Sequence, residues 1–172
     1  MATNLQFIKS VTASGGVNTL DISDCFSAEY DVYELLIPKV DTASNFYPSF
    51  RFLKASDGSA DTTSNYDSAG LLFGTTGISE IRYTNQTAVI NSFGLASTND
   101  ANNFGRVTIY NPFDSSSYTF INGHAVFVFS ALEGGKTIAV HKVAQSNSGI
   151  QLMFSNMTEV KASIYGVKWV VA

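Results

Sequence analysis

The chain has 172 residues, of which 45% are hydrophobic and only 14% are charged, and its net charge is −4. A chain of this length can bury a sizeable core, so we expect residues 1–172 to form a single domain. The ten basic residues are scattered, which argues against nucleic acid as a partner. No apolar run reaches the roughly 20 residues of a bilayer span, and no basic amphipathic stretch indicates binding to a membrane surface.

The first half of the sequence predicts a series of short strands. Apolar and polar residues alternate, and clusters of Ser, Thr, Asn, Asp and Gly interrupt the alternation. Ser14-Gly15-Gly16 marks one such break, and 56–68 and 97–103 read as polar surface loops. Pro38 places the end of its strand at a sheet edge or a bulge. We expect strands at 5–13, 17–22, 30–40, 46–55, 71–73, 80–83 and 87–95.

The second half continues the same pattern with longer apolar segments. Strands are expected at 104–110, 118–130, 136–144, 150–155 and 160–171, and no helical period persists over three turns. Short strands at this spacing indicate an all-β fold, an antiparallel β-sandwich that is jelly-roll-like. We expect 104–110 to pair with 118–130 across the turn at 111–117.

Two sequence features of this region indicate a turn and a hairpin or bulge. Asn111, Pro112 and Asp114 suit a turn, because Asn can cap it, Pro presets φ and Asp bonds back to the backbone. Asn122-Gly123 fits either a two-residue hairpin or a glycine bulge, and the resumption of the strand pattern favours the bulge.

Two apolar runs, 125–129 and 169–171, break the alternation expected of a strand with one wet face. One interpretation is a central, covered strand. The other is a subunit interface, for which Phe127, Phe129 and Trp169 are the candidate residues, and it predicts a homotrimer or larger assembly.

Residues whose side chains could act in catalysis or bind a metal do not form a recognisable pattern. Cys25 fits a buried apolar position, and His124 and His141 have no ligand pattern nearby, so we expect no metal, no cofactor and no enzymatic activity. Gly134-Gly135-Lys136-Thr137 lacks the rest of a phosphate-binding loop and is interpreted as a β-turn. The 56–68 loop contains three aspartates, Asp57, Asp61 and Asp67. They could bind a calcium ion, but we interpret them as solvated turn residues.

The segment 109–123 resembles a segment of small virion proteins of tailed bacteriophages, many from marine and cyanobacterial hosts. The shared pattern is Tyr-Asn-Pro-x-Asp, then Tyr, then Ile-Asn-Gly, which is carried here by Tyr110 to Asp114, Tyr118 and Ile121 to Gly123. The opening strand at 7–14, the strand at 30–40 and the closing pair, with Gly166 in its Tyr-Gly-aliphatic ending, are similar too.

The resemblance implies a non-enzymatic structural protein of the virion, made in the host cytoplasm, which binds other virion proteins such as the major capsid protein or tail components. Because the chain begins in its β domain, we expect a capsid decoration or cement protein. The alternative is a tail-fibre or receptor-binding tip that binds a host-surface glycan through exposed aromatics and carboxylates. A glycan hydrolase, with paired carboxylates about 5 to 10 Å apart, is a third hypothesis.

Overall fold

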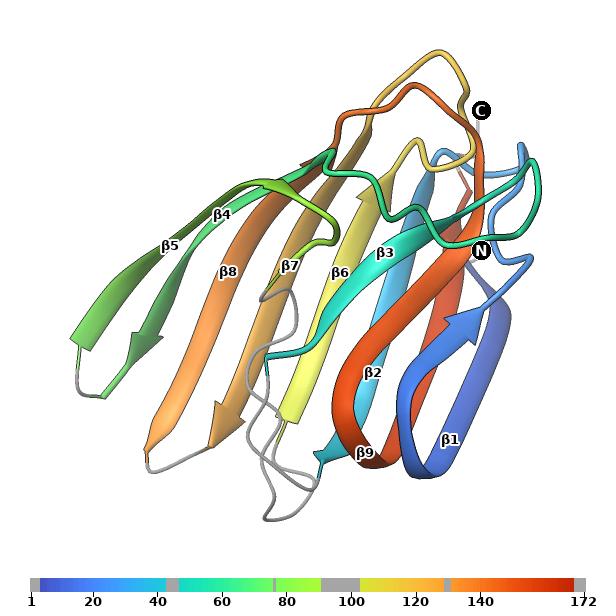
Figure 1. Cartoon of the computed structure of the whole chain (residues 1–172). Coiled ribbons are helices and arrows are strands. Elements are labelled where there is room, and N and C mark those ends of the chain that lie inside the picture. Colours follow the sequence, from blue (N-terminus) through green and yellow to red (C-terminus); the bar gives the residue numbers. More distant parts are fainter. Residues whose placement is uncertain (1–3, 43–46, 76, 91–102, 129–130, 169–172) are drawn as a thin grey trace.

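The computed structural model describes residues 4–42, 47–75, 77–90, 103–128 and 131–168, and every regular element in these ranges is a strand (Figure 1). The prediction of an all-β fold is therefore confirmed. The strands are β1 (Leu5–Ile22), β2 (Val32–Thr42), β3 (Ser49–Lys54), β4 (Tyr66–Gly74), β5 (Gly77–Gln86), β6 (Asn103–Tyr110), β7 (Thr119–Val128), β8 (Leu132–His141) and β9 (Asn147–Val167).

All strand pairs are antiparallel, in the order β1-β9-β2-β6-β7-β8-β4-β5, and β3 pairs with β9. The long strand β9 holds two layers together, because its first part pairs with β3 and its second part pairs with β2. Figure 1 shows β3 in front of β2 and β6. The two sheets of the expected sandwich are thus one continuous sheet that curls over its own core.

The ribbon of β1 and β9 bends where the sequence predicted breaks between strands. Gly15 and Gly16 have φ of 89° and 79°, and Asn156, on the facing strand, has φ of 50°. The register of β1 against β9 shifts between Ser14 and Val17. The backbone N–H of Asn156 donates to Asn18 Oδ1 at 2.9 Å, which fixes the two bends against each other. Residues 5–13 and 17–22 are therefore one bent strand, and so are 150–155 and the described part of 160–171.

The core lies between the two layers and is rich in aromatic rings. On β2, the alternate residues Tyr33, Leu35 and Ile37 share one face and have no solvent exposure. From β3, Phe50 and Phe52 face them and are equally buried, with their ring centroids 5.6 Å apart. Each such side chain contributes about 1.5–3 kcal/mol when it leaves water, so the core is the main source of stability.

The loop predicted at 56–68 was partly wrong, and the strand predicted at 87–95 is described only in part. The loop predicted at 56–68 ends at Tyr66, which begins β4 and is fully buried. Of the predicted strand 87–95, Val89 forms an isolated antiparallel bridge with Phe50, and 91–95 lies outside the described residues, as does most of the predicted loop 97–103. Pro38 lies where the β2–β9 register shifts, between Leu36 and Lys39, which fits the bulge of the two predicted alternatives, although β2 does not end there but continues to Thr42.

The β-turn predicted at Gly134-Gly135-Lys136-Thr137 was also wrong, because these residues lie inside β8. The two glycines make room for side chains of the neighbouring strand β4. A Cβ on Gly134 would lie 3.1 Å from the ring of Phe73, and one on Gly135 would lie 3.0 Å from Leu72. Glycine is used here for close packing across strands rather than for a turn.

Candidate functional site

The most distinctive surface of the protein is the outward side of β6, β7, β8, β4 and β5. Along β7, side chains alternate between the core and solvent, so that Ile121 and Phe127 are buried while Phe120 and Val126 are about half exposed. A strand with one wet face normally carries polar residues at the outward positions. Here the outward positions are largely apolar.

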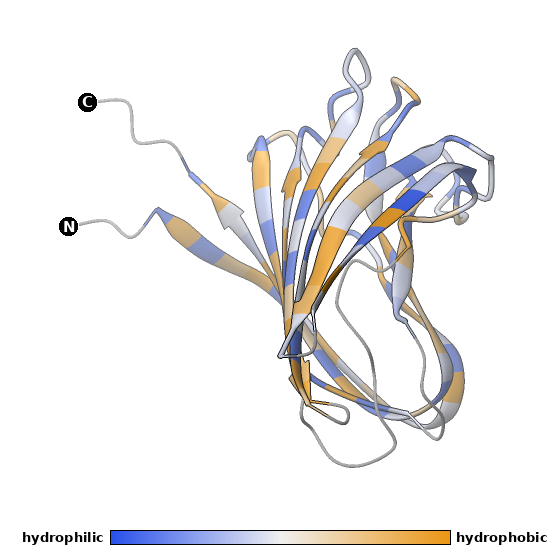
Figure 2. Ribbon diagram, turned by 90° about the vertical axis from the view of Figure 1, so that its left-hand side faces the viewer, coloured by the Kyte–Doolittle hydropathy of each residue, from blue (hydrophilic) through white to orange (hydrophobic). Residues whose placement is uncertain are grey.

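The same side of the neighbouring strands is also apolar, because directly paired residues in a sheet share a face. Ile138 on β8 is 60% exposed and Ile78 on β5 is 74% exposed. Figure 2 shows hydrophobic segments on successive strands of the sheet. We call this surface the outer apolar face, and it consists of Leu71, Phe73, Ile78, Phe104, Tyr110, Phe120, Val126, Val128, Leu132 and Ile138, with exposures of 36% to 74%.

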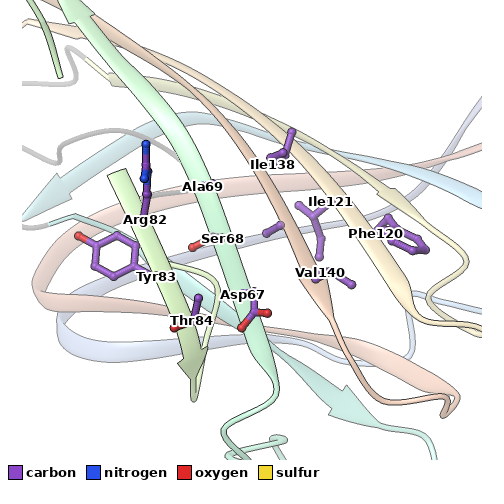
Figure 3. Close-up of a pocket in the computed structure, with 11 residues that line it drawn as sticks. Asp67, Ser68, Ala69, Arg82, Tyr83, Thr84, Phe120, Ile121, Ile138 and Val140 are labelled. Atoms are coloured by element: carbon purple, nitrogen blue, oxygen red, sulfur yellow. The ribbon is translucent and has the colours of Figure 1, made fainter. Parts of the chain in front are cut away.

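A groove of about 590 Å³ lies on this side of the sheet, between β7 and β5 (Figure 3). Phe120, Ile138 and Val140 line one part of it, and Asp67 and Arg82 lie at the other. A second hollow of about 410 Å³ lies farther along β8, beside Phe73, Val126 and Leu132. The outer apolar face is therefore hollowed rather than flat.

The charged groups around the groove are already paired within the chain. Asp67 accepts from the Lys142 ammonium at 2.8 Å and from the backbone N–H of Asn85 at 2.7 Å, and these contacts hold the pKa of Asp67 below its usual value. The Arg82 guanidinium donates to Glu80 on the same strand. These charges leave few free groups to recognise a charged ligand in the groove.

A row of basic side chains crosses the same face at right angles to the strands. Arg106, His124 and Lys136 are direct cross-strand neighbours on β6, β7 and β8. The guanidinium of Arg106 donates twice to Glu34, at 2.9 and 3.1 Å, and the hydroxyl of Thr108 donates to the same carboxylate. The side chain of His124 is exposed and has no hydrogen bond within the described ranges, and the side chain of Lys136 has none there either.

A buried polar cluster lies on the opposite side of the sheet, and the sequence did not reveal it. His141 has no solvent exposure, and its Nε2 lies 3.0 Å from Asp61 Oδ2. The ring of Tyr66 stacks on the imidazole with centroids 4.4 Å apart. Asp61 also accepts from Gln145 at 3.0 Å and from the backbone N–H of Thr63 at 3.0 Å.

The electrostatics of this cluster follow from its burial. Burial lowers the pKa of His141, and the Asp61 carboxylate offsets this only in part. Burial alone would raise the pKa of Asp61, but the hydrogen bonds from Thr63 and the nearby imidazole outweigh it, so the pKa is lowered. His141 is therefore neutral and donates from Nε2, while its buried Nδ1 has no partner among the described residues. The cluster is closed to solvent, so it holds the 56–65 loop against β8 rather than meeting a substrate.

The three loop aspartates have separate environments. Asp57 is an exposed turn residue that accepts from Ser59, as expected. Asp61 is 4% exposed, so its interpretation as a solvated turn residue was wrong, because it lies beneath His141 and Gln145. The described residues contain no group of His, Cys, Asp or Glu that could hold a metal ion.

The predicted turn at 111–117 is confirmed, and with it the pairing of β6 with β7. Asn111 has φ of 55°, and its N–H donates to the carbonyl of Asp31 at 2.7 Å. Asp114 accepts from the backbone N–H of Ser116 at 2.8 Å, and the carbonyl of Pro112 accepts from Asn147 N–H at 2.8 Å. The turn is thereby tied to the start of both β2 and β9.

The glycine bulge preferred at Asn122-Gly123 was wrong. β7 pairs without a register shift on both sides through these residues, with Asn122 opposite Thr108 and Ile138. Gly166 has a clearer role, because a Cβ there would lie 2.5 to 2.7 Å from atoms of the Tyr30 ring. Its missing side chain lets that ring lie against the sheet.

The candidate interface residues are placed only in part. Phe127 is 2% exposed and packs with Ala125 on the inner side, so the surface of this apolar run is formed by Val126 and Val128 instead. Phe129 and Trp169 lie outside the described residues. Cys25 is buried, as expected, and burial raises the pKa of its thiol to about 12.

No protein-family model matches the sequence, and no curated protein matches it either. The described residues include no helix with the length and hydropathy needed to cross a bilayer.

Proposed function

We propose that the chain is a non-enzymatic structural protein of a tailed-bacteriophage virion, most specifically a capsid decoration or cement protein that acts as a homo-oligomer. The observation that carries the proposal is the outer apolar face. A face built from half-exposed Ile, Leu, Val and Phe side chains gains stability when another protein surface covers it. The resemblance of 109–123 to small virion proteins is the reason for proposing a phage particle as the place where this contact forms.

The fold supports a role in attachment in a second way. Nine strands in one curled sheet, with the long β1–β9 ribbon shared between layers, form a stiff support for a binding surface. The one buried acid–base pair of the described chain, Asp61 and His141, is closed to solvent. We interpret this pair as structural, which fits a role in non-covalent attachment.

The proposal is tested by whether the virion contains the chain and where in the particle the chain lies. Purified virions of the phage that encodes the chain should contain it at a fixed copy number, and a cryo-EM map should place it on the lattice of the major capsid protein. Density on the tail instead would favour the tail-fibre alternative. Absence from purified virions, with abundant chain in the infected cell, would refute the proposal.

A receptor-binding tip is the second candidate, and one cluster favours it. Tyr110 and Phe120 are cross-strand partners, and Tyr118 lies at the end of the same turn, with exposures of 36%, 50% and 47%. Exposed rings present flat apolar faces on which sugar rings can stack. Asp114, in the adjoining turn, is an exposed carboxylate.

Glycan binding separates this candidate from the first. The isolated chain would bind host-surface glycans on an array, and Tyr118→Ala would weaken the binding at least tenfold. Phe7→Ala, at a 61% exposed position on β1, is the control and should bind as the unaltered chain does. Equal signals from both variants would exclude the aromatic cluster as the glycan site.

A further inference from the structure

We propose that the outer apolar face is covered by a second copy of this chain. The inference deepens the proposed function, because it identifies the surface through which a homo-oligomer forms. It rests on the size of the face and on the balance of charges across it.

The size of the face matches a stable protein interface. Ten apolar side chains are between 36% and 74% exposed on it. If each leaves about half of roughly 150 Å² in solvent, the face presents on the order of 750 Å² of apolar surface. The largest apolar patch of a typical monomer covers roughly 300–600 Å², whereas one partner of a standard interface contributes about 800 Å².

The charges on this face favour a copy of the same chain over a partner of opposite charge. The chain as a whole carries a net charge of −4, which makes copies repel each other at long range. On the outward side of β2, β6, β8, β4 and β5, however, the acids Glu34, Glu80 and Asp67 form ion pairs with Arg106, Arg82 and Lys142 of the same chain. Lys136, on β8, adds one positive charge to the face. Two such faces can meet with most of their charge already neutralised within each copy.

The shape of the outer apolar face suits packing against a second copy. Ile138, which is 60% exposed, lines the groove beside Phe120, and the hollow beside Phe73 lies farther along β8. Side chains from two sheets interdigitate when sheets pack face to face. Ile138 lies near the middle of the face and is the residue on which a test should be made.

The experiment measures self-association of the whole chain by sedimentation equilibrium between 1 and 200 μM (concentrations on the scale of ordinary protein–protein affinities). The expected masses are multiples of 18.5 kDa. Ile138→Lys should weaken association at least tenfold. Phe7→Lys is the matched control, because Phe7 is 61% exposed and lies on β1, outside the face. Far-UV circular dichroism of both variants checks that the fold persists.

Cross-linking then identifies the occupant. Ile138→Cys should form a covalent dimer on mild oxidation, whereas Phe7→Cys should associate without a covalent cross-link, and buried Cys25 should not react. A monomer at every concentration would overturn the inference, as would an Ile138→Lys variant that associates normally, for example through the free edge of β5. A monomer that attaches to capsids through Ile138 would overturn the inference and the homo-oligomeric part of the proposed function but leave the decoration role standing, whereas absence from virions would refute the function alone.

Discussion

At the scale of single residues, His141 shows how burial becomes a dependence on pH. Its pKa is lowered in the folded protein, so the unfolded chain binds more protons at pH values below about 6.5. Stability is therefore fully present above the unfolded pKa of His141 and decreases as the pH falls below it. The lowered pKa of Asp61 acts in the same direction, but only in more acidic solution, below the ordinary Asp value of 3.8.

We predict that the free energy of unfolding, measured by urea denaturation, decreases between about pH 7.5 and pH 5.5. This one group contributes a slope of at most about 1.4 kcal/mol per pH unit. His141→Gln removes the titration and should flatten the slope. His124→Gln is the control, because His124 is exposed on the outer face. An unchanged slope in His141→Gln would show that another group is responsible.

Gly166 is a second residue whose role is specific. Its backbone lies under the Tyr30 ring, which packs edge-on against Tyr33 with centroids 5.7 Å apart. We predict that Gly166→Ala destabilises the fold by about 1–3 kcal/mol, because the added methyl group must displace the ring. Chemical denaturation measures the loss. In a Tyr30→Ala background the same substitution should cost much less, and equal costs in both backgrounds would contradict the proposed clash.

The residue scale is also where sequence reasoning reached its limit. Asp114 was correctly expected to bond back to the turn, since Ser116 is two positions away. The bond between Asp61 and His141 spans 80 positions, and no local pattern encodes it. The pair forms only because β4 and β8 become neighbours in the sheet, a fact of topology that composition and alternation do not contain.

At the scale of elements, alternation predicted the strands well and their ends poorly. Alternation is a local consequence of the two-residue period, so it indicates which side chains of β2 share a face. A glycine in the sequence does not tell a turn, a bend and close packing apart, because its backbone freedom and missing side chain suit all three. Gly15-Gly16 bends a continuous strand, and Gly134-Gly135 accommodates side chains inside one, although both pairs were interpreted as interruptions.

The bend in β1 gives a prediction for that element. Gly15 has φ of 89°, and nothing lies within 4 Å of the position its Cβ would take. Gly15→Ala should therefore test backbone conformation alone, with an expected cost of about 1–2 kcal/mol in the free energy of unfolding. Gly15→Asn should cost less, because Asn tolerates left-handed φ. If the two variants were equally stable, the bend would not depend on the left-handed conformation.

At the scale of the whole molecule, the two-faced apolar run indicated an apolar surface without locating it. The run at 125–129 was correctly recognised as having two apolar sides. Phe127 was nonetheless chosen as an interface residue, although it faces inward, because periodicity shows that two faces exist but not which one the rest of the chain covers. The contributions of β4, β5 and β8 to the same face depend on strand order, which was not predicted.

Association through that face would make the stability of the molecule depend on its concentration. Binding between folded copies stabilises the folded state by mass action, so Tm should rise with protein concentration. A hundredfold increase adds about 1.4 kcal/mol per chain for a dimer, which corresponds to roughly 3–5 °C for a domain of this size. Scanning fluorimetry at 2 and 200 μM would measure the shift. Ile138→Lys should abolish it and Phe7→Lys should retain it, whereas a Tm that is independent of concentration in the unaltered chain would mean that the outer apolar face stays uncovered in solution.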